Sequence, residues 1–313
     1  MVENTLPIPF VAFLSLTAVI FNTVAILAIR RTRSLSQTFK ILLLNLAVAD
    51  AGVGLISQPL NFAILIMEIE NHHFKYLPEL EKICNSTNNL LSVASFLGVT
   101  AIAADRFLAV YLHLRYEELV TNKRVASAVA AVWTVSVIIA LLQEWEENIA
   151  FVIIATLFII CLIVIALFYF KLHLVVKYHT QQIMAQQIQC RENNDKLEWL
   201  NAERQKRSAI MIIYVYLALL ICCLPTTILH TLYSVRIDSP PIFQFICDIL
   251  FVLNSSLNPL IYWWKMKHIR HAAKAILGFW DPNRRKLSWK PYTIGKMFSW
   301  TKLIKNCYFF KSK

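Results

Sequence analysis

Seven long apolar runs divide this chain, and they constrain its fold more than any other feature of the sequence. A helix needs about 20 predominantly apolar residues to cross the hydrocarbon core of a membrane. The runs cover Ile8–Ile29, Ile41–Met67, Cys84–Tyr111, Val125–Leu142, Ile149–Val176, Ala209–Tyr233 and Ile242–Trp264. The sequence therefore predicts a protein that crosses a membrane several times.

Composition decides between the two architectures that span membranes, the helix bundle and the β-barrel. Hydrophobic residues make up 58% of the chain and charged residues 16%, whereas charged residues are about a quarter of a soluble domain. Only 5 glycines occur, and no run alternates between apolar and polar residues as barrel strands do. We expect an all-α membrane protein, a seven-transmembrane helix bundle.

The distribution of lysine and arginine sets the predicted orientation of the bundle. Cytoplasmic loops carry an excess of both residues. Here they cluster after the first and third runs and before the sixth, at Arg30, Arg31, Arg33, Lys40, Arg115, Lys123, Arg124, Lys196, Arg204, Lys206 and Arg207. The N-terminus is thus predicted outside. The formal net charge of +12 then reflects topology and anionic membrane lipids, and no nucleic-acid partner is expected.

Polar side chains inside the apolar runs mark candidate functional positions, because their burial in a membrane is costly. One set recurs three and four residues apart, on one helical stripe that should face the bundle: Asn85, Asn88, Asn89, Ser92 and Ser95. Isolated polar residues of three other runs are predicted to form one hydrogen-bonded network at mid-membrane depth: Asn22, Asp50, Asn254, Ser255, Ser256 and Asn258.

An acid and a base, Asp105 and Arg106, stand side by side at the end of the third run. Charges in an apolar medium are costly unless they are paired or functional. Five features then stand in order along the chain: LNLAVAD at 44–50, ADRF at 104–107, the lone Trp133 of the fourth run, CCLP at 222–225 and NPLIY at 258–262. In this order and spacing the chain resembles the rhodopsin-like (class A) G-protein-coupled receptors, from Asn22 to Leu277.

The resemblance implies a plasma-membrane receptor, not an enzyme, that binds an extracellular ligand and activates heterotrimeric G proteins. Membrane lipids and arrestin are further implied partners. In this family the arginine that matches Arg106 is held by its neighbouring acid, here Asp105, and is released when the sixth helix swings outward. Phe107 replaces the usual tyrosine. The implied coupling and activation residues also include Leu114, Tyr116, Tyr169, Pro225, Asn258, Pro259 and Tyr262.

A sodium pocket is also implied by the resemblance. Its matching residues are Asp50, Ser95, Asn254 and Asn258, and their oxygen atoms suit a hard cation. An allosteric sodium ion is therefore expected, and no other cofactor.

Departures from the family pattern limit what can be said of the ligand. Cys223 replaces the usual tryptophan switch and Cys161 the proline of the fifth helix. With a very short second outer loop that lacks cysteine, these features resemble the melanocortin branch. Only Glu81 matches that branch's acidic cluster, while Leu60 and Asn85 stand at its other acidic positions. The ligand class of that branch is therefore not carried over.

Polar groups in the outer halves of the bundle-facing segments predict a ligand pocket, formed by Asn88, Ser92, Cys223, His230 and Asp248. The neutral amide of Asn88 favours a neutral or amphipathic small molecule or a short peptide. Two alternatives stay open. The first is an amine-responsive receptor that uses Asp248 as counter-ion. The second is a membrane transporter, which an internal repeat or correspondingly broken helices would favour, although the sequence shows neither. A retinal-binding opsin is excluded, because Val252 stands at the Schiff-base lysine position.

The predicted organisation has four parts: an extracellular N-terminus (1–7), the bundle (8–264), an amphipathic eighth helix (265–278) and a basic, aromatic cytoplasmic tail (279–313). Residues Thr180 to Arg207, polar and free of proline and glycine, should extend the fifth and sixth helices into the cytosol. Three modifications are left open, namely a Cys84–Cys247 disulfide, palmitoylation of Cys307 and glycosylation of Asn85.

Overall fold

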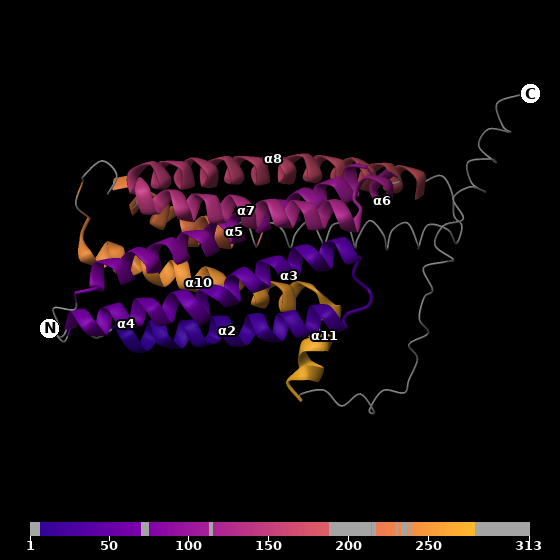
Figure 1. The fold of residues 1–313 in the computed structure, drawn as a ribbon. Coiled ribbons are helices and arrows are strands. Elements are labelled where there is room, and N and C mark those ends of the chain that lie inside the picture. The colour runs from indigo at the N-terminus through magenta and orange to yellow at the C-terminus, as the bar shows by residue number, and fades with distance from the viewer. Residues whose placement is uncertain are drawn as a thin grey trace, which may run out of the picture.

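The computed structural model of the chain describes residues 7–69, 75–112, 115–187, 214, 217–229, 231–232, 237 and 239–278. The regular elements in these ranges are helices that run side by side (Figure 1). Six of the described helices are long and apolar enough to cross a membrane, and Leu217–Leu229 is a shorter apolar helix. Each predicted run is found at one of these helices, which confirms the seven-helix bundle.

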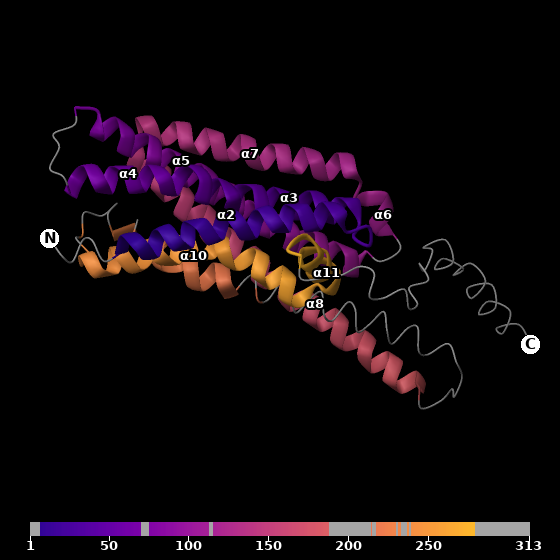
Figure 2. The same cartoon turned by 90° about the horizontal axis from the view of Figure 1, so that it is seen from below.

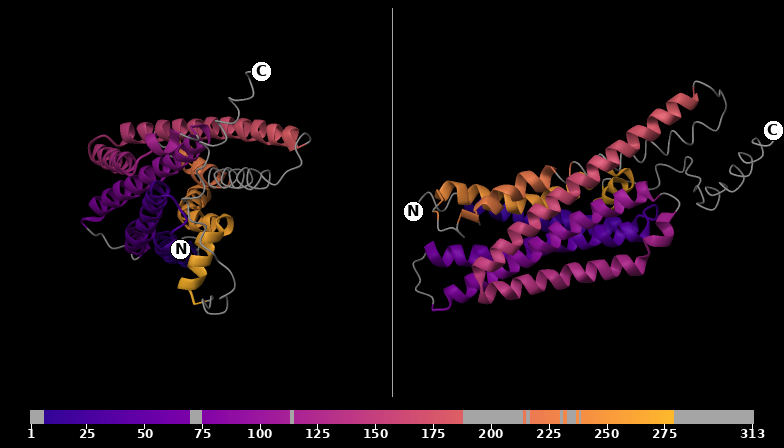
Figure 3. Two further views of the ribbon diagram at one scale, coloured as in Figure 1. Left: turned by 90° about the vertical axis from the view of Figure 1, so that its right-hand side faces the viewer. Right: turned by 90° about the horizontal axis from the view of Figure 1, so that it is seen from above.

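The labelled elements are α2 (Pro7–Arg31), α3 (Gln37–Gly52), the π-helical segment η1 (Val53–Ser57), α4 (Gln58–Ile69), α5 (Leu77–Tyr111), α6 (Tyr116–Leu119), α7 (Asn122–Trp145), α8 (Glu147–Gln187), α10 (Pro241–Lys265) and α11 (Lys267–Ile276). We call the end of the bundle that carries α6 the α6 end. Figures 2 and 3 show α8 extending past the other helices there. This matches the predicted extension of the fifth helix; residues 188–207 of that prediction lie outside the described part of the chain.

Helix starts follow from local chemistry. The Ser36 side chain accepts a hydrogen bond from the backbone N–H of Phe39 and caps α3 (3.4 Å), and Thr121 caps α7 through Arg124 in the same way (3.4 Å). α5 begins earlier than the predicted Cys84, because Pro78 favours the first turn of a helix. The additional turns are polar and project from the apolar span.

The second membrane segment is irregular at its centre, which the sequence analysis did not predict. In η1 the N–H of Gln58 bonds to the carbonyl of Val53, one residue further back than in an α-helix. Pro59 follows directly and lacks an N–H, so a regular ladder could not continue through it. Within η1, Gly54 lets α2 approach closely, and its carbonyl accepts a hydrogen bond from the Ser15 hydroxyl (3.0 Å).

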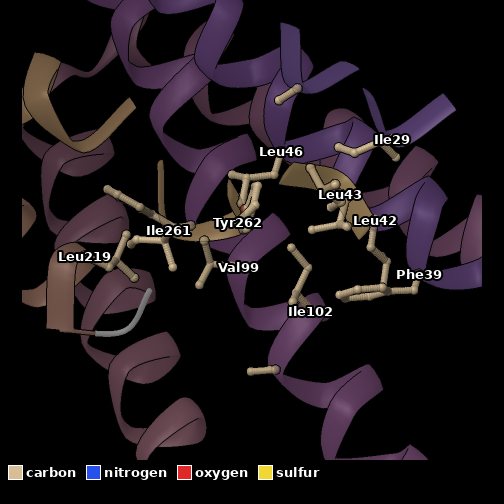
Figure 4. Close-up of a cluster of buried hydrophobic side chains, with 14 of the residues drawn as sticks. Ile29, Phe39, Leu42, Leu43, Leu46, Val99, Ile102, Leu219, Ile261 and Tyr262 are labelled. Carbon is tan, nitrogen blue, oxygen red and sulfur yellow. The ribbon is translucent and has the colours of Figure 1, made fainter. Parts of the chain in front are cut away.

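Aliphatic and aromatic side chains of several helices form the core (Figure 4). The core draws on α3, α5, α10 and the helix Leu217–Leu229, through Phe39, Leu42, Leu43, Leu46, Val99, Ile102, Leu219, Ile261 and Tyr262. α7 and α8 bury far less of their surface and expose large apolar side chains, among them Ile138, Leu141, Ile160, Ile163 and Phe170. These exposed faces suit contact with lipid chains.

α11 lies within residues 265–278, for which an amphipathic eighth helix was predicted. It turns away from the direction of α10 and packs against α2 (Figure 1). Its apolar face buries Ile269 and Ala273, while Lys267, His268 and Lys274 are exposed. Gly278, with a φ of 73°, ends this segment in the left-handed conformation that glycine adopts without strain.

Candidate functional site

At the α6 end of α5, Asp105 and Arg106 form an ion pair. The Nε–H of Arg106 donates to Oδ2 of Asp105 (2.9 Å), and an Nη2–H donates to the same oxygen. Asp105 is only 4% exposed, whereas the side chain of Arg106 keeps 19% of its surface accessible. The acid is therefore shielded, and the base lies where a partner at this end of the bundle can reach it.

A tyrosine from α6 completes the surroundings of Asp105. The hydroxyl of Tyr116 donates to the second carboxylate oxygen, Oδ1, at 2.5 Å. Thr38, in the first turn of α3, lies 3.4 Å from the same hydroxyl. Burial and the hydrogen bond to Asp105 both raise the pKa of the Tyr116 phenol above its ordinary value. Tyr116 thus remains a protonated donor at neutral pH, and it ties α6 to α5.

The guanidinium of Arg106 also rests on an aromatic ring that the sequence analysis missed. Its Cζ lies 3.9 Å from the ring centroid of Phe39, a cation–π contact. The capped start of α3 presents this ring, and no spacing in the sequence relates Phe39 to Arg106. The base is therefore held in place by Asp105 and by Phe39.

Phe107 performs a packing role at the same level. Its ring stacks on Phe168 of α8 (centroids 4.9 Å apart, planes at 14°) and on Tyr111 one helical turn away (5.4 Å, 19°). Such aromatic pairs stabilise a contact beyond the area they bury. Phe107 lacks the hydroxyl of the usual family tyrosine, and it joins α5 to α8 through these stacked rings.

Mid-way along the bundle, Asp50 joins three helices. Its Oδ1 accepts a hydrogen bond from Ser95 of α5 (3.2 Å), and its Oδ2 accepts one from Nδ2 of Asn258 of α10 (2.8 Å). Three residues before Asn258, the carbonyl of Ser255 accepts a hydrogen bond from the Asn22 amide at 2.9 Å. Asn254 is buried, and its Oδ1 has no hydrogen-bond partner among the described residues.

The lone tryptophan of the fourth run, Trp133, fixes α7 to α3. Its Nε1–H donates to Oδ1 of Asn45 at 2.8 Å. Gly98 of α5 lies directly behind, since a Cβ at that position would come within 2.9 Å of Asn45 Nδ2. Three helices therefore meet at this amide.

The other predicted activation residues are distributed over the bundle. Tyr169 lies half-buried on α8, and Pro225 lies half-buried within Leu217–Leu229. Pro259 lies inside α10. Tyr262 is buried, and its hydroxyl has no partner in the described ranges. Leu114 lies outside the described residues.

The predicted ligand residues are brought together only in part. Oδ1 of Asn88 accepts a hydrogen bond from the Ser57 hydroxyl of η1, and Ser92 donates to the Asn88 carbonyl at 2.6 Å. Cys223 is buried in the hydrophobic core. His230 and the side chain of Asp248 lie outside the described part of the structure. Of the five residues, Asn88 and Ser92 are thus placed together on α5, and Cys223 belongs to the hydrophobic core.

Opposite the α6 end, a polar cavity of about 200 Å³ lies between the first turns of α5 and the last turn of α7. It is lined by Lys82, Asn85, Ser86, Gln143, Glu144 and Trp145. Beneath it, Asn89 donates to Gln143 at 2.6 Å. Asn85 is exposed where it lines this cavity, so the expectation that it faces the bundle interior with the rest of the polar stripe is wrong.

The structure also bears on the Cys84–Cys247 disulfide that the sequence left open. Cys84 and Cys247 are both buried and form no disulfide. The thiol of Cys84 instead donates to Oδ1 of Asn61 at 3.0 Å. This contact joins α5 to α4.

Comparison with known proteins gives the family. The sequence model of the family described as "7 transmembrane receptor (rhodopsin family)" matches residues 21–262. The chain belongs to this family. As a member of the rhodopsin family it is a multi-pass membrane receptor, in agreement with its motifs and its apolar helices.

Individual relatives of this rhodopsin-family receptor are distant but cover most of its length. Adenosine receptor A3 of Ovis aries is 23% identical over 289 residues, which are 84% of this chain and 87% of the relative. Melanocortin receptor 3 of Rattus norvegicus is 24% identical over 285 residues (84% and 83%). Melanocortin receptor 5 of Ovis aries is 26% identical over 285 residues (85% and 82%). The melanocortin-like features of the sequence thus coincide with detectable similarity to that branch.

Proposed function

We propose that this plasma-membrane receptor activates heterotrimeric G proteins through Arg106, which its partners hold at rest and release on activation. The observation that carries the proposal is the arrangement at the α6 end. Asp105 is buried and has its oxygens engaged by Arg106 and Tyr116, while the guanidinium keeps an accessible surface. A buried pair of this kind near a bundle end costs desolvation, which supports a switching role. In this proposal the α6 end faces the cytoplasm.

The test compares Arg106→Ala with Arg115→Ala, a matched loss of an exposed arginine at the same end. Both variants should reach the cell surface in wild-type amounts, measured with an N-terminal epitope. Nucleotide exchange on a panel of purified G proteins should fall to background for Arg106→Ala and persist for Arg115→Ala. Exchange at the wild-type level in Arg106→Ala would overturn the proposal.

For the ligand, we propose a neutral or amphipathic small molecule or a short peptide that binds opposite the α6 end near Asn88. The amide of Asn88 is neutral and accepts a hydrogen bond from Ser57, so it cannot offset a desolvated cation as a carboxylate would. Some relatives are named for adenosine and others for melanocortin. Those names differ, so the similarity alone selects no single ligand.

A panel of amines, nucleosides, lipids and short peptides tests the ligand class. Wild type should respond to a non-amine, and Asn88→Ala should weaken that response, while Asp248→Asn keeps it. Cyclic AMP and calcium serve as readouts. Potent activation by an amine that is lost only in Asp248→Asn would favour the alternative, an amine receptor with Asp248 as counter-ion.

We also propose that sodium binds beside Asp50. Ser95 and Asn258 orient the carboxylate, and Asn254 lies one turn before Asn258 on the same face of α10. The buried Oδ1 of Asn254 has no described partner, so it is available as an oxygen ligand. This set of a carboxylate, an amide and a hydroxyl fits a hard cation.

A further inference from the structure

A cluster of three side chains links the sixth helix to the end of α10. Tyr214 is helical and precedes the described helix Leu217–Leu229 in the chain. Its ring meets that of Trp264 edge to face, with centroids 5.0 Å apart and planes at 62°. The ammonium of Lys265 lies over both rings, 4.0 Å from the Tyr214 centroid and 3.5 Å from the Trp264 centroid. One cation is therefore shared by two aromatic faces from two helices.

The cluster lies where a movement of the sixth helix would have to break it. Pro225 lies within Leu217–Leu229, and a proline in a helix removes a backbone hydrogen bond and favours bending. Tyr214 lies on the α6-end side of Pro225. Any movement of that part of the sixth helix away from α10 has to separate Tyr214 from Lys265 and Trp264.

We infer that Tyr214, Trp264 and Lys265 form a latch that holds the sixth helix against α10 in the resting receptor. The inference rests on the proposed function, since opening the latch matters for signalling only if a G protein binds at the α6 end. The three residues act by positioning the helix and not by contact with the G protein. Lys265 is half-buried, while Tyr214 and Trp264 are exposed, so each contact has the modest strength of a solvent-accessible cation–π pair.

The first test measures ligand-independent nucleotide exchange, with each variant normalised to its surface amount. Tyr214→Leu removes the aromatic ring and leaves an apolar side chain, and Lys265→Met removes the cation while keeping a side chain of similar length, so each variant loses the cation–π contact of Tyr214 with Lys265. Because the resting state dominates, weakening it should raise basal exchange by about threefold to tenfold. Lys265→Arg keeps a cation over the rings and should behave as wild type. The matched control is Tyr76→Leu, which removes a looser cation–π pair with Lys75 (5.7 Å) at the opposite end.

A second measurement separates failure of the latch from failure of G-protein coupling. Spin labels at Leu119→Cys and Leu217→Cys, both exposed positions, report the distance between α6 and the sixth helix. Cys190 and Cys307 are replaced by serine in this background, while the five described cysteines are buried. Tyr214→Leu and Lys265→Met should enlarge a population with a longer distance.

The outcomes are distinct. A longer-distance population without a rise in exchange keeps the latch and counts against G-protein coupling. Unchanged distances in both variants overturn the latch, whatever the exchange assay gives. An equal change in Tyr76→Leu also overturns it, because the effect would then be a general one of losing an aromatic ring. If Trp264 and Lys265 serve only as membrane-interface anchors, Tyr214→Leu leaves distances and exchange unchanged.

Discussion

At the scale of single residues, Asp105 lies at the centre of the proposed coupling site. One of its oxygens is bound by Arg106 and the other by Tyr116. Loss of the Tyr116 hydroxyl removes one donor without disturbing the charge pair itself. Hydrogen bonds to charged groups contribute about 1.5–3 kcal/mol, so this one hydroxyl has a measurable share in the resting state.

Tyr116→Phe should therefore raise basal nucleotide exchange by roughly tenfold to a hundredfold, since the Asp105 carboxylate loses the hydrogen bond that fixes it beside Arg106. Tyr111→Phe is the control, because that tyrosine is exposed and phenylalanine retains its stack on Phe107. The measurement is exchange per receptor at the cell surface. Identical basal rates for wild type and Tyr116→Phe would show that the hydroxyl does not restrain Arg106.

The pKa of Tyr116 defines the pH range in which its hydrogen bond to Asp105 exists. The pKa of Tyr116 is raised above its ordinary value of about 10. A group with a raised folded-state pKa contributes its stability below the unfolded value and loses it as the pH rises through the folded value. The hydrogen bond to Asp105 therefore persists through the physiological range and is lost only in strong alkali.

The Asp105–Arg106 pair shows what could be predicted from the sequence at this scale. Asp105 and Arg106 were predicted as a pair from their motif, and Tyr116 was implied by the family resemblance as a coupling residue; the structure brings all three together. Phe39 was missed, because it lies far from Arg106 in the chain and only the packing of α3 against α5 joins them. A local motif identifies residues by their chemical type and spacing. Contacts between helices depend on how the helices are rotated against one another, which a motif does not show.

At the scale of elements, two glycines of the second membrane segment allow close packing: Gly54 of η1 against α2, and Gly52, the last residue of α3, against α5. A Cβ at Gly54 would lie 2.8 Å from the Ser15 carbonyl oxygen and 2.7 Å from a methyl group of Val19. A Cβ at Gly52 would lie 2.8 Å from the end of the Leu91 side chain. Backbone cannot move aside as a side-chain terminus can, so the two positions differ in tolerance.

Gly54→Ala should destabilise the receptor by about 1–3 kcal/mol, as expected for overpacking, and Gly52→Ala by less. Thermal unfolding in detergent micelles, followed by exposure of buried thiols, measures the difference. Equal melting temperatures for the two variants would mean that α2 shifts away from η1 at little cost.

The helices themselves were predictable, and their irregularities were not. Each apolar run marks a membrane helix because apolar length alone satisfies the bilayer. The widened turn at η1 depends on one backbone hydrogen bond, from the N–H of Gln58 to the carbonyl of Val53. α5 begins before its apolar run because polar helical turns remain stable outside the apolar span. Hydropathy carries neither kind of information.

At the scale of the whole molecule, the carboxylate of Asp50 ties α3, α5 and α10 together. A ligand that binds only the folded state stabilises it by mass action. If sodium occupies the site beside Asp50, the stability of the entire bundle should depend on that ion.

Wild-type receptor in detergent should therefore melt at a higher temperature in sodium chloride than in an equal concentration of choline chloride. Asp50→Asn should lose this difference, because an amide cannot supply the anionic ligand. Asn22→Ala, in a neighbouring hydrogen bond to α10, is the control that should lower stability equally in both salts. If the sodium effect survives in Asp50→Asn, either sodium binds at another site or the effect is a general effect of salt.

Unequal burial across the bundle has a consequence for how the chain tolerates change. In the apolar windows of α7 and α8 only 22% and 17% of residues are buried, against 67% for the second and third membrane segments. A substitution on the exposed faces of α7 and α8 exchanges one lipid-facing group for another and leaves the packing intact. Tolerance to substitution should therefore be greatest on the exposed faces of α7 and α8, where one apolar residue can replace another at little cost in folding free energy.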